Sequence, residues 1–532
     1  MVINTLNFNK NKHLIFLSVS FIITYLFFIY IRLVIVPLGA DFGTDVYYHI
    51  RVSDIFPFVA TTQKFPWTEM SIWKHSFYDK ELGFHAVIYV LRLLSSFLGI
   101  SLNAPFHFIN FILVFFVLLT MSIGGYIYCK SASFLIPPLY LFIAPISIQR
   151  LICIRPFIFS VIIFITIVFI LLSRLKLKTK CIFMFFIGWL YVLFYSVPHL
   201  IIIPVTIYCV VRILYERSYK SLLTLFLLLC STFGIAVGLC IHPQFPSTFT
   251  GWYVMAFLII KQALGLGAND IMIGLGIRPP DLLTIVYNIP FLLISIFYMF
   301  FFFITKKKTI EQWFLLILQL VLISGYFCNQ RFSEYAIPII IFNFSYAVFN
   351  YKNFILNSKI CRFIDTWKYA LIIIFLLIAI PFNKFILKHS VFYPPLYDYG
   401  RWASENLKPG TYVALLRWHN FGRAFYVASQ YSYSTALDPM YSYFIYPERT
   451  KKIERFITGK ILLTPEELAE LFGTNLLYIS MRGDLPFAEY LIYCGAVILY
   501  SDKQGCLLEL TKSNSFIQPR PKPPKLQFLG DV

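Results

Sequence analysis

Long apolar stretches alternate with short polar loops over the first three quarters of the chain. They lie near residues 14–36, 106–128, 132–149, 156–173, 181–197, 200–214, 221–241, 282–304, 312–327, 333–351 and 369–387. Most of them approach the roughly 20 residues that an α-helix needs to cross a hydrocarbon core of about 30 Å. The pattern therefore predicts a polytopic α-helical membrane protein with about 11 transmembrane helices.

One further apolar stretch, residues 83–100, could also cross but contains His85 and Arg92. If it crossed, the basic cluster at 174–180 would share a side with the acidic loop at 41–81. If it instead lies along the interface, every basic cluster between the spans falls on one side, as expected for cytoplasmic loops. We therefore predict a multi-pass plasma (inner) membrane protein with a retained N-terminal anchor, a cytoplasmic N-terminus and outer loops at 38–105 and 242–281.

The pattern changes after about residue 387. TYVALLR, LLYIS, AVILYS and CLLEL are typical of strands, whereas WASENL, TPEELAELF and FAEYLIYC are typical of short helices. We predict a transmembrane domain over 1–387 and an extracytoplasmic α/β domain over 388–512. The remaining residues, 513–532, contain the run QPRPKPPK and are predicted to form a disordered tail.

Composition and charge exclude a soluble enzyme and a disordered scaffold. Of the 532 residues, 59% are hydrophobic and 13% are charged, about half of the roughly 25% charge of soluble proteins. The net charge of +20 lies mostly in short loops between apolar spans, so it indicates membrane topology and predicts no nucleic-acid partner. The ten cysteines show no CxxC pair and no metal-type spacing.

The loop after the first span carries the densest polar chemistry. Its sequence runs GADFGTDVYYHIRVSDI and later DKELGFH, with Asp41 and Asp45 just beyond the apolar stretch. Carboxylates at a bilayer edge are costly to hold and mark candidate functional sites. A solvated start of a loop explains the same spacing, so both interpretations stand at this point.

Three segments, in this order, resemble a known superfamily. They are TDVYYHIR after the first span, Asn329-Gln330-Arg331-Phe332 before a span containing Pro338, and the stretch from Tyr397 that includes Trp418-His419-Asn420-Phe421-Gly422. They resemble the GT-C polyprenyl-linked glycosyltransferases, and most of all the catalytic subunits of oligosaccharyltransferases. In that family the first loop is acidic, an arginine faces the lipid-linked phosphate, and a WWDYG motif follows the first strand of the outer domain.

The resemblance implies a membrane glycosyltransferase that moves a sugar from a polyprenyl-phosphate or polyprenyl-diphosphate donor to a glycan, lipid or protein acceptor on the extracytoplasmic face. Such a transfer needs a base for the acceptor and cations for the leaving phosphate, for which arginine is well suited. The candidate residues are Asp41 and Asp45 for catalysis, Arg331, Arg155, Arg150 and His85 for the donor phosphate, and Tyr48, His49, Asp270 and Trp418 for the acceptor or substrate. Asp45, His49 and His85 are the candidate ligands of a divalent cation, Mg²⁺ or Mn²⁺. Each arginine is also compatible with a role as an anchor among membrane lipid headgroups, Arg331 least of the three because of its motif context.

Two departures from the family pattern affect this interpretation. The segment Gln149–Pro156 has two arginines and no carboxylate where oligosaccharyltransferases have a second acidic motif. The stretch Trp418–Gly422 lacks the second Trp and the Asp of WWDYG, which argues against an oligosaccharyltransferase that moves a preassembled glycan to protein. A lipid or solute transporter or flippase is the alternative from another class, but the spans are polar mainly at their outer ends and show no internal repeat.

Overall fold

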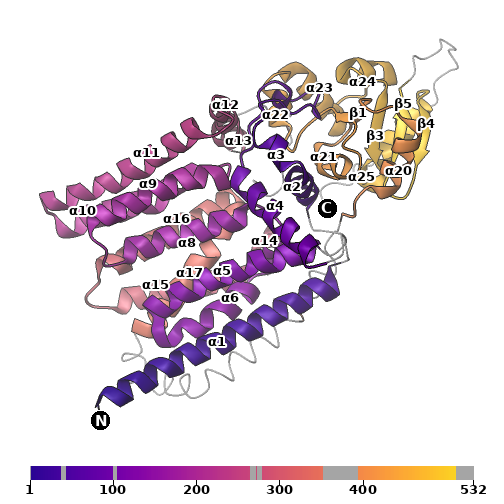
Figure 1. The fold of residues 1–532 in the computed structure, drawn as a ribbon. Helices are drawn as coiled ribbons and strands as arrows, with labels where there is room; N and C mark the ends of the chain where they lie inside the picture. The colour runs from indigo at the N-terminus through magenta and orange to yellow at the C-terminus, as the bar shows by residue number, and fades with distance from the viewer. Residues whose placement is uncertain are drawn as a thin grey trace. The chain divides into compact units, whose positions relative to one another are not determined.

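The computed structural model describes residues 2–36, 43–99, 105–263, 278–350 and 393–510, together with the single residues 266, 271 and 381. The chain divides into two compact units that are interleaved in sequence (Figure 1). The first comprises 1–42, 90–241 and 276–392, and the second 43–89, 242–275 and 393–532. Asp41, Asp270, the tail at 513–532 and, apart from Pro381, the predicted span at 369–387 lie outside the described residues.

The first unit is helical throughout its described part. Its α-helices are α1 (Val2–Ile35), α5 (Pro105–Cys129), α6 (Ile136–Phe142), α7 (Pro145–Ile152), α8 (Phe157–Leu172), α9 (Leu177–Phe194), α10 (Ile202–Glu216), α11 (Leu225–Ile241), α14 (Leu282–Tyr287), α15 (Ile289–Ile304), α16 (Ile310–Cys328) and α17 (Ser333–Asn350). Short 3₁₀ turns connect several of them: η2 (Lys130–Leu135), η3 (Pro198–Ile201), η4 (Tyr219–Thr224) and η7 (Gln330–Phe332).

The prediction of a polytopic helical membrane protein is confirmed. Among the described residues, seven helical segments are long and apolar enough to cross a membrane, or eight if the bent pair α7–α8 is one span. The predicted span at 132–149 is divided among η2, α6 and α7, because Pro145 begins a new helix. Helices α7 and α8 then meet at an angle of 119°. Within the described residues, these breaks leave fewer continuous spans than the apolar pattern alone predicts there.

Helix α4 (Leu82–Phe97) covers most of the stretch 83–100, which the sequence predicts to lie along the membrane interface. It is a single apolar helix of 16 residues, and it is not among the segments long enough to span a membrane. Its predicted interfacial position, like the orientation of the whole chain, stays a prediction.

Helices α9 and α11 run side by side in the first unit (Figure 1). Small residues allow this approach, because a Cβ on Gly234 would lie 2.1 Å from the carbonyl oxygen of Phe185 and one on Gly188 would lie 2.5 Å from that of Ser231. Gly234 and Gly238 form a GxxxG pair on α11. Without water between them, membrane helices associate largely through such close backbone packing.

The second unit contains a mixed five-stranded sheet, so the α/β character predicted for the C-terminal region is confirmed. The strands are β1 (Tyr412–Leu415), β2 (Ser432–Tyr433), β3 (Leu476–Ser480), β4 (Val497–Ser501) and β5 (Gly505–Glu509). Their order is β2-β1-β3-β5-β4, in which β1 is parallel to β2 and β3, whereas β5 is antiparallel to β3 and β4. All four predicted strand segments occur in this sheet.

The helices of the second unit have clear local signals in the sequence. They are α2 (Asp45–Asp54), α3 (Phe56–Val59), η1 (Ile72–Lys74), α12 (Ser247–Tyr253), the π-helix η5 (Val254–Leu258), α13 (Ile259–Ala263), α20 (Tyr397–Asn406), η8 (Trp418–Asn420), α21 (Phe421–Val427), α22 (Met440–Tyr443), α23 (Pro447–Ile457), α24 (Pro465–Phe472) and α25 (Met481–Tyr493). Helix α24 begins with a capping box between Thr464 and Glu467, has Pro465 in its first turn and ends at Gly473 in the left-handed conformation.

The first loop extends one edge of the sheet. Thr68 forms a parallel bridge with Tyr433 of β2, and the backbone N–H of Met70 donates to the carbonyl of Ser434 at 2.8 Å. These bonds satisfy backbone groups that an open sheet edge would leave exposed. They explain why residues 43–89 fold together with residues that lie more than 300 positions later in the chain.

Candidate active site

A buried cluster of ionisable side chains occupies the first loop in the second unit. His49 lies on α2, and its Nδ1 is 2.8 Å from Nε2 of His85 at the start of α4. The other ring nitrogen of His85, Nδ1, is 2.7 Å from a carboxylate oxygen of Asp79. Because all three side chains are at least 97% buried, they form a fixed series of hydrogen bonds from a carboxylate through two imidazoles.

Glu81 completes this cluster. Its carboxylate lies 3.6 Å from the ammonium group of Lys80 through Oε1, while Oε2 is buried and has no hydrogen-bond partner among the described residues. Burial raises the pKa of Glu81, and the charges of Lys80 and His85 act in the opposite direction. A buried oxygen without a partner next to two imidazoles is an arrangement that a bound cation would satisfy.

The residues that hold Asp79 come from two segments of the chain. The side-chain oxygen of Gln244 accepts the backbone N–H of Asp79 at 2.6 Å, while the amide nitrogen of Gln244 donates to the carbonyls of Val59 and Thr62. Asp79 also accepts the backbone N–H of Glu81 at 3.1 Å. Gln244 thus fixes the turn that presents both carboxylates.

Aromatic side chains enclose the cluster. Tyr48 is 99% buried, and its ring centroid lies 5.7 Å from the imidazole of His85 and 5.7 Å from the indole of Trp73. Burial, followed by the charges of Asp79 and Glu81, raises the pKa of the Tyr48 hydroxyl well above its usual value. Tyr48 is therefore a neutral wall of this site at physiological pH.

His49, Glu81 and His85 have the composition and spacing of a metal site. Their ligand atoms all lie within 4.8 Å of one another. Asp79 binds the far nitrogen of His85, which is how an outer carboxylate orients a metal-bound imidazole and increases its basicity. Two imidazoles and a carboxylate suit Mn²⁺ or Zn²⁺ better than Mg²⁺, which prefers oxygen ligands. The residues present therefore fit a divalent cation.

Asp45 begins α2, one helical turn before His49, so both residues lie on one side of the helix. Its carboxylate is half-buried and is close enough to Glu81 to contribute to the raised pKa of that residue. The first turn of α2 packs against α21, where a Cβ on Gly422 would lie only 2.5 Å from the carbonyl oxygen of Thr44. The glycine that ends the segment Trp418–Gly422 thus permits the position of Asp45.

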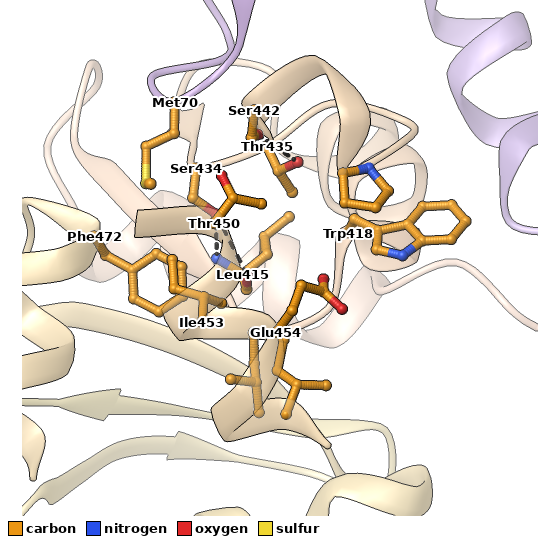
Figure 2. Close-up of a pocket in the computed structure, with 13 residues that line it drawn as sticks. Met70, Leu415, Trp418, Ser434, Thr435, Ser442, Thr450, Ile453, Glu454 and Phe472 are labelled. Atoms are coloured by element: carbon orange, nitrogen blue, oxygen red, sulfur yellow. Dashed lines mark hydrogen bonds between the residues drawn. The ribbon is translucent and has the colours of Figure 1, made fainter. Parts of the chain in front are cut away.

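Trp418 and His419 lie in the turn η8, directly before α21. The indole of Trp418 is half-buried and lines a small cavity (Figure 2). Burial lowers the pKa of His419 to about 4, and the positive charges of Arg417 and Arg423 add to this effect. The His419 ring is therefore neutral at physiological pH.

The three predicted phosphate-binding arginines all lie in the first unit. Arg150 forms an ion pair with Glu334 on α17, and its guanidinium lies 4.8 Å from the ring centre of Phe157. Arg331 lies in η7 just before α17, and its Nε has no hydrogen-bond partner among the described residues. Arg155 is half-buried at the bend between α7 and α8.

Four residues of these sites, Asp79, Glu81, Gln244 and Glu334, have no role predicted from the sequence. Asp79 and Glu81 lie within the segment DKELGFH. Glu81 is four residues before His85 and Asp79 is six residues before it, and this spacing was the available signal. Gln244 occurs in the run HPQFP, and Glu334 is three residues after Arg331. Only the folded chain shows that each of these side chains contacts a predicted site residue or its neighbour.

Comparison with known proteins gives similarity in structure alone. No protein-family model matches the sequence, and no curated protein is similar to it. The fold resembles the archaeal oligosaccharyltransferase AglB from Archaeoglobus fulgidus, solved with an inhibitory peptide and a dolichol-phosphate, with a TM-score of 0.59 and 14% identity over 95% of this chain and 75% of that protein. It also resembles ArnT from Cupriavidus metallidurans bound to undecaprenyl phosphate, with a TM-score of 0.51 and 11% identity over 93% of this chain and 98% of that protein. The resemblance to GT-C glycosyltransferases is therefore confirmed in the fold over nearly the whole chain.

Proposed function

We propose that this protein is a membrane glycosyltransferase that transfers a sugar from a polyprenyl-phosphate or polyprenyl-diphosphate donor to an acceptor on the extracytoplasmic face of the membrane. The observation that carries the proposal is the buried cluster of His49, Asp79, Glu81 and His85 beside Asp45, within a GT-C fold. The fold similarity to AglB and ArnT, which were solved with polyprenyl phosphates, supports a lipid-linked donor.

Asp45 is the proposed general base. It stands at the start of α2, where its position is fixed by the close packing on Gly422. A carboxylate in this position can take the proton of an acceptor hydroxyl or amide as that group attacks the sugar. Asp41, the other predicted base, lies outside the described residues.

The cluster of His49, Glu81 and His85 is proposed to hold a divalent cation. When bound, such a cation offsets the negative charge that develops on the leaving phosphate. Asp79 and Gln244 keep the ligands in place through hydrogen bonds of 2.6–2.9 Å. These contacts fix Asp79 and His85, whereas the 2.8 Å hydrogen bond between the His49 and His85 rings would have to open on binding.

Arg331 is the proposed phosphate ligand of the first unit. Glu334 already neutralises Arg150, and the contact of Arg150 with Phe157 further favours a structural role for it. The Nε of Arg331 has no hydrogen-bond partner among the residues that the structure describes, and the planar guanidinium can bind two phosphate oxygens at once. The Arg331→Lys variant keeps the charge but loses this fork.

A panel of lipid-linked sugars tests the function. The purified protein is incubated with polyprenyl-phosphate and polyprenyl-diphosphate donors that carry one sugar or an oligosaccharide, with and without Mn²⁺, and the release of the lipid phosphate is measured. We expect release with at least one donor class, and a fall of about 10²-fold or more in Asp45→Asn. Asp54→Asn, at the other end of α2, serves as the control and should keep its turnover.

Arg331 requires a separate comparison. We expect Arg331→Lys to raise the KM for the donor by roughly tenfold or more, since hydrogen bonds to charged groups contribute about 1.5–3 kcal/mol. The KM for the acceptor should change little. Wild-type turnover in Asp45→Asn would exclude Asp45 as the base, and wild-type kinetics in Arg331→Lys would show that Arg331 is only an anchor.

A further inference from the structure

The segment 242–263 of the second unit exposes aromatic side chains in a regular row. It comprises the run HPQFP, helix α12, the π-helix η5 and helix α13. Phe245, Phe249, Tyr253 and Phe257 follow one another at intervals of four residues, and each of them is 41–51% exposed. These four side chains are called the aromatic ridge below.

The aromatic ridge consists of two pairs of neighbouring rings. The ring centroids of Phe245 and Phe249 lie 5.9 Å apart, and those of Tyr253 and Phe257 lie 5.8 Å apart. In an α-helix a step of four residues advances by about 40° around the axis, so a long row would drift off one face. The wider turn of the π-helix reduces this drift between Tyr253 and Phe257, whose rings are stacked at 28°. The local backbone therefore keeps the rings on one side.

Three polar side chains of this segment point inward. Gln244 and Thr248 are fully buried, and Ser247 is 94% buried. The side chains of Ser247 and Ser76 form a hydrogen bond of 2.9 Å, and the amide of Gln244 donates to the carbonyl of Val59 at 2.6 Å. A surface helix in water has the opposite arrangement, with its apolar residues buried and its polar residues exposed. This inversion indicates apolar surroundings for the aromatic ridge.

Charge supports the same interpretation. The segment 242–263 contains no Asp or Glu, and its only Lys or Arg is Lys261, which is exposed and lies one further step of four residues after Phe257. Surfaces that face water usually carry about 25–35% charged residues, and contiguous exposed apolar patches mark interaction sites. The aromatic ridge thus fits an apolar partner, and a lysine at its end suits lipid phosphates.

The position of the ridge in the sequence favours the lipid bilayer as this partner. Phe245 comes four residues after Ile241, the last residue of α11. The helical segment Tyr219–Ile241 is long and apolar enough to cross a membrane. Four residues extend over at most about 14 Å, so the ridge begins within reach of the lipid headgroups. Aromatic side chains are enriched at this depth, where their rings contact both headgroups and acyl chains.

We propose that the aromatic ridge is a membrane-contact surface whose rings insert at the boundary between lipid headgroups and acyl chains. The opposite face of the same segment holds the backbone of Asp79 through Gln244. The segment would therefore connect the lipid surface with the turn that carries Asp79. The proposal concerns lipid contact alone and does not depend on the proposed transfer reaction.

Photo-crosslinking of the full-length protein tests this contact. The photoreactive residue p-benzoylphenylalanine replaces Phe249 or Phe257, the protein is placed in nanodiscs of phosphatidylethanolamine and phosphatidylglycerol, and intact-mass spectrometry counts phospholipid adducts after irradiation. Phe233, which is 63% exposed on the predicted span α11, is the positive control. Leu462, which is 45% exposed between α23 and α24, is the matched control outside the ridge.

We expect phospholipid adducts at both ridge positions at a level similar to that at Phe233. This level should exceed that at Leu462 by about tenfold or more, because an interfacial helix keeps its apolar face in the lipid. Benzoylphenylalanine retains the phenyl ring of the residue that it replaces. The two ridge positions are tested separately, so if one variant does not fold, the other decides.

Three results would overturn the proposal. A covalent dimer on a denaturing gel would show that a second copy of the chain covers the ridge. A crosslink within one chain would show that another segment of the same protein covers it. Adducts no more frequent than at Leu462, in an experiment that labels Phe233, would show that the ridge faces water.

Discussion

Adding one methyl group at Gly422 tests whether the position of α2 controls the proposed chemistry. In Gly422→Ala the new Cβ would lie 2.5 Å from the carbonyl oxygen of Thr44, whereas ordinary contact begins near 3.4 Å. The contacted atom belongs to the backbone, so no side-chain rotation can relieve the clash. The first turn of α2, which carries Asp45, and α21 must therefore separate by about 0.9 Å, the difference between these two distances.

This shift sets the expected loss of activity. A displacement of about 1 Å between reacting groups can lower a rate by roughly 10²-fold. We expect the turnover of Gly422→Ala in the lipid-phosphate release assay to fall by about 10-fold to 100-fold. Overpacking of a well-filled interior also costs about 1–3 kcal/mol of stability, so thermal unfolding is measured alongside turnover.

Gly400→Ala separates the two effects. Its Cβ would lie 3.0–3.2 Å from atoms of Val427 and does not contact α2. We expect this control to lose some stability while it keeps near wild-type turnover. Wild-type turnover in Gly422→Ala, or an equal loss of turnover in Gly400→Ala, would refute the idea that the contact between Gly422 and Thr44 positions the base.

Three other predictions follow from packing and charge. Asp79→Asn should weaken Mn²⁺ or Zn²⁺ binding by about 10-fold to 100-fold in calorimetry, because the amide orients His85 less firmly; unchanged affinity would argue against the site. Gly234→Ala should lower the melting temperature by several degrees, since its Cβ would lie 2.1 Å from a backbone oxygen of α9, whereas Ala236→Val at an exposed position should not. Burial lowers the pKa of His242 to about 4. On acidification His242 is therefore protonated in the unfolded chain before it is protonated in the folded chain, and the free energy of unfolding falls as the pH drops from about 6.5 to 4. The loss is about 2 kcal/mol at about pH 5, and His242→Gln should flatten the melting profile over this range; an identical profile would exclude this linkage.

Local sequence patterns were sufficient for most of the C-terminal region. The four predicted strands occur in the sheet, and α24 begins and ends where its capping box and Gly473 indicate. These signals are local, because a cap or an alternating strand depends only on neighbours within a few residues. The membrane spans were harder to predict from the sequence. A break at Pro145 and a 119° bend before α8 divide the helices, although the sequence stays apolar across both positions.

The candidate site depended on contacts that sequence order does not contain. His49 and His85 are 36 residues apart, and Gln244 reaches Asp79 across 165 residues. Arg150 was predicted to bind phosphate because the sequence around it does not reveal its partner. That partner, Glu334, lies 184 residues away in the chain. A residue type can suggest a role, but the partner that neutralises or orients it appears only after folding.

The absence of a second acidic motif, one of the departures from the oligosaccharyltransferase pattern, can be connected with these contacts. The segment Gln149–Pro156 has no carboxylate, so it cannot supply the acidic cation ligands that the family resemblance leads one to expect there. The first loop instead contains two imidazoles and a carboxylate within 4.8 Å of one another, supported by Asp79. Replacement of hard oxygen ligands by imidazoles shifts the preferred cation from Mg²⁺ toward Mn²⁺ or Zn²⁺. The same cation preference should therefore be measurable by binding alone, before any donor or acceptor is known, and selective binding of Mg²⁺ over Mn²⁺ would contradict the proposed ligand set.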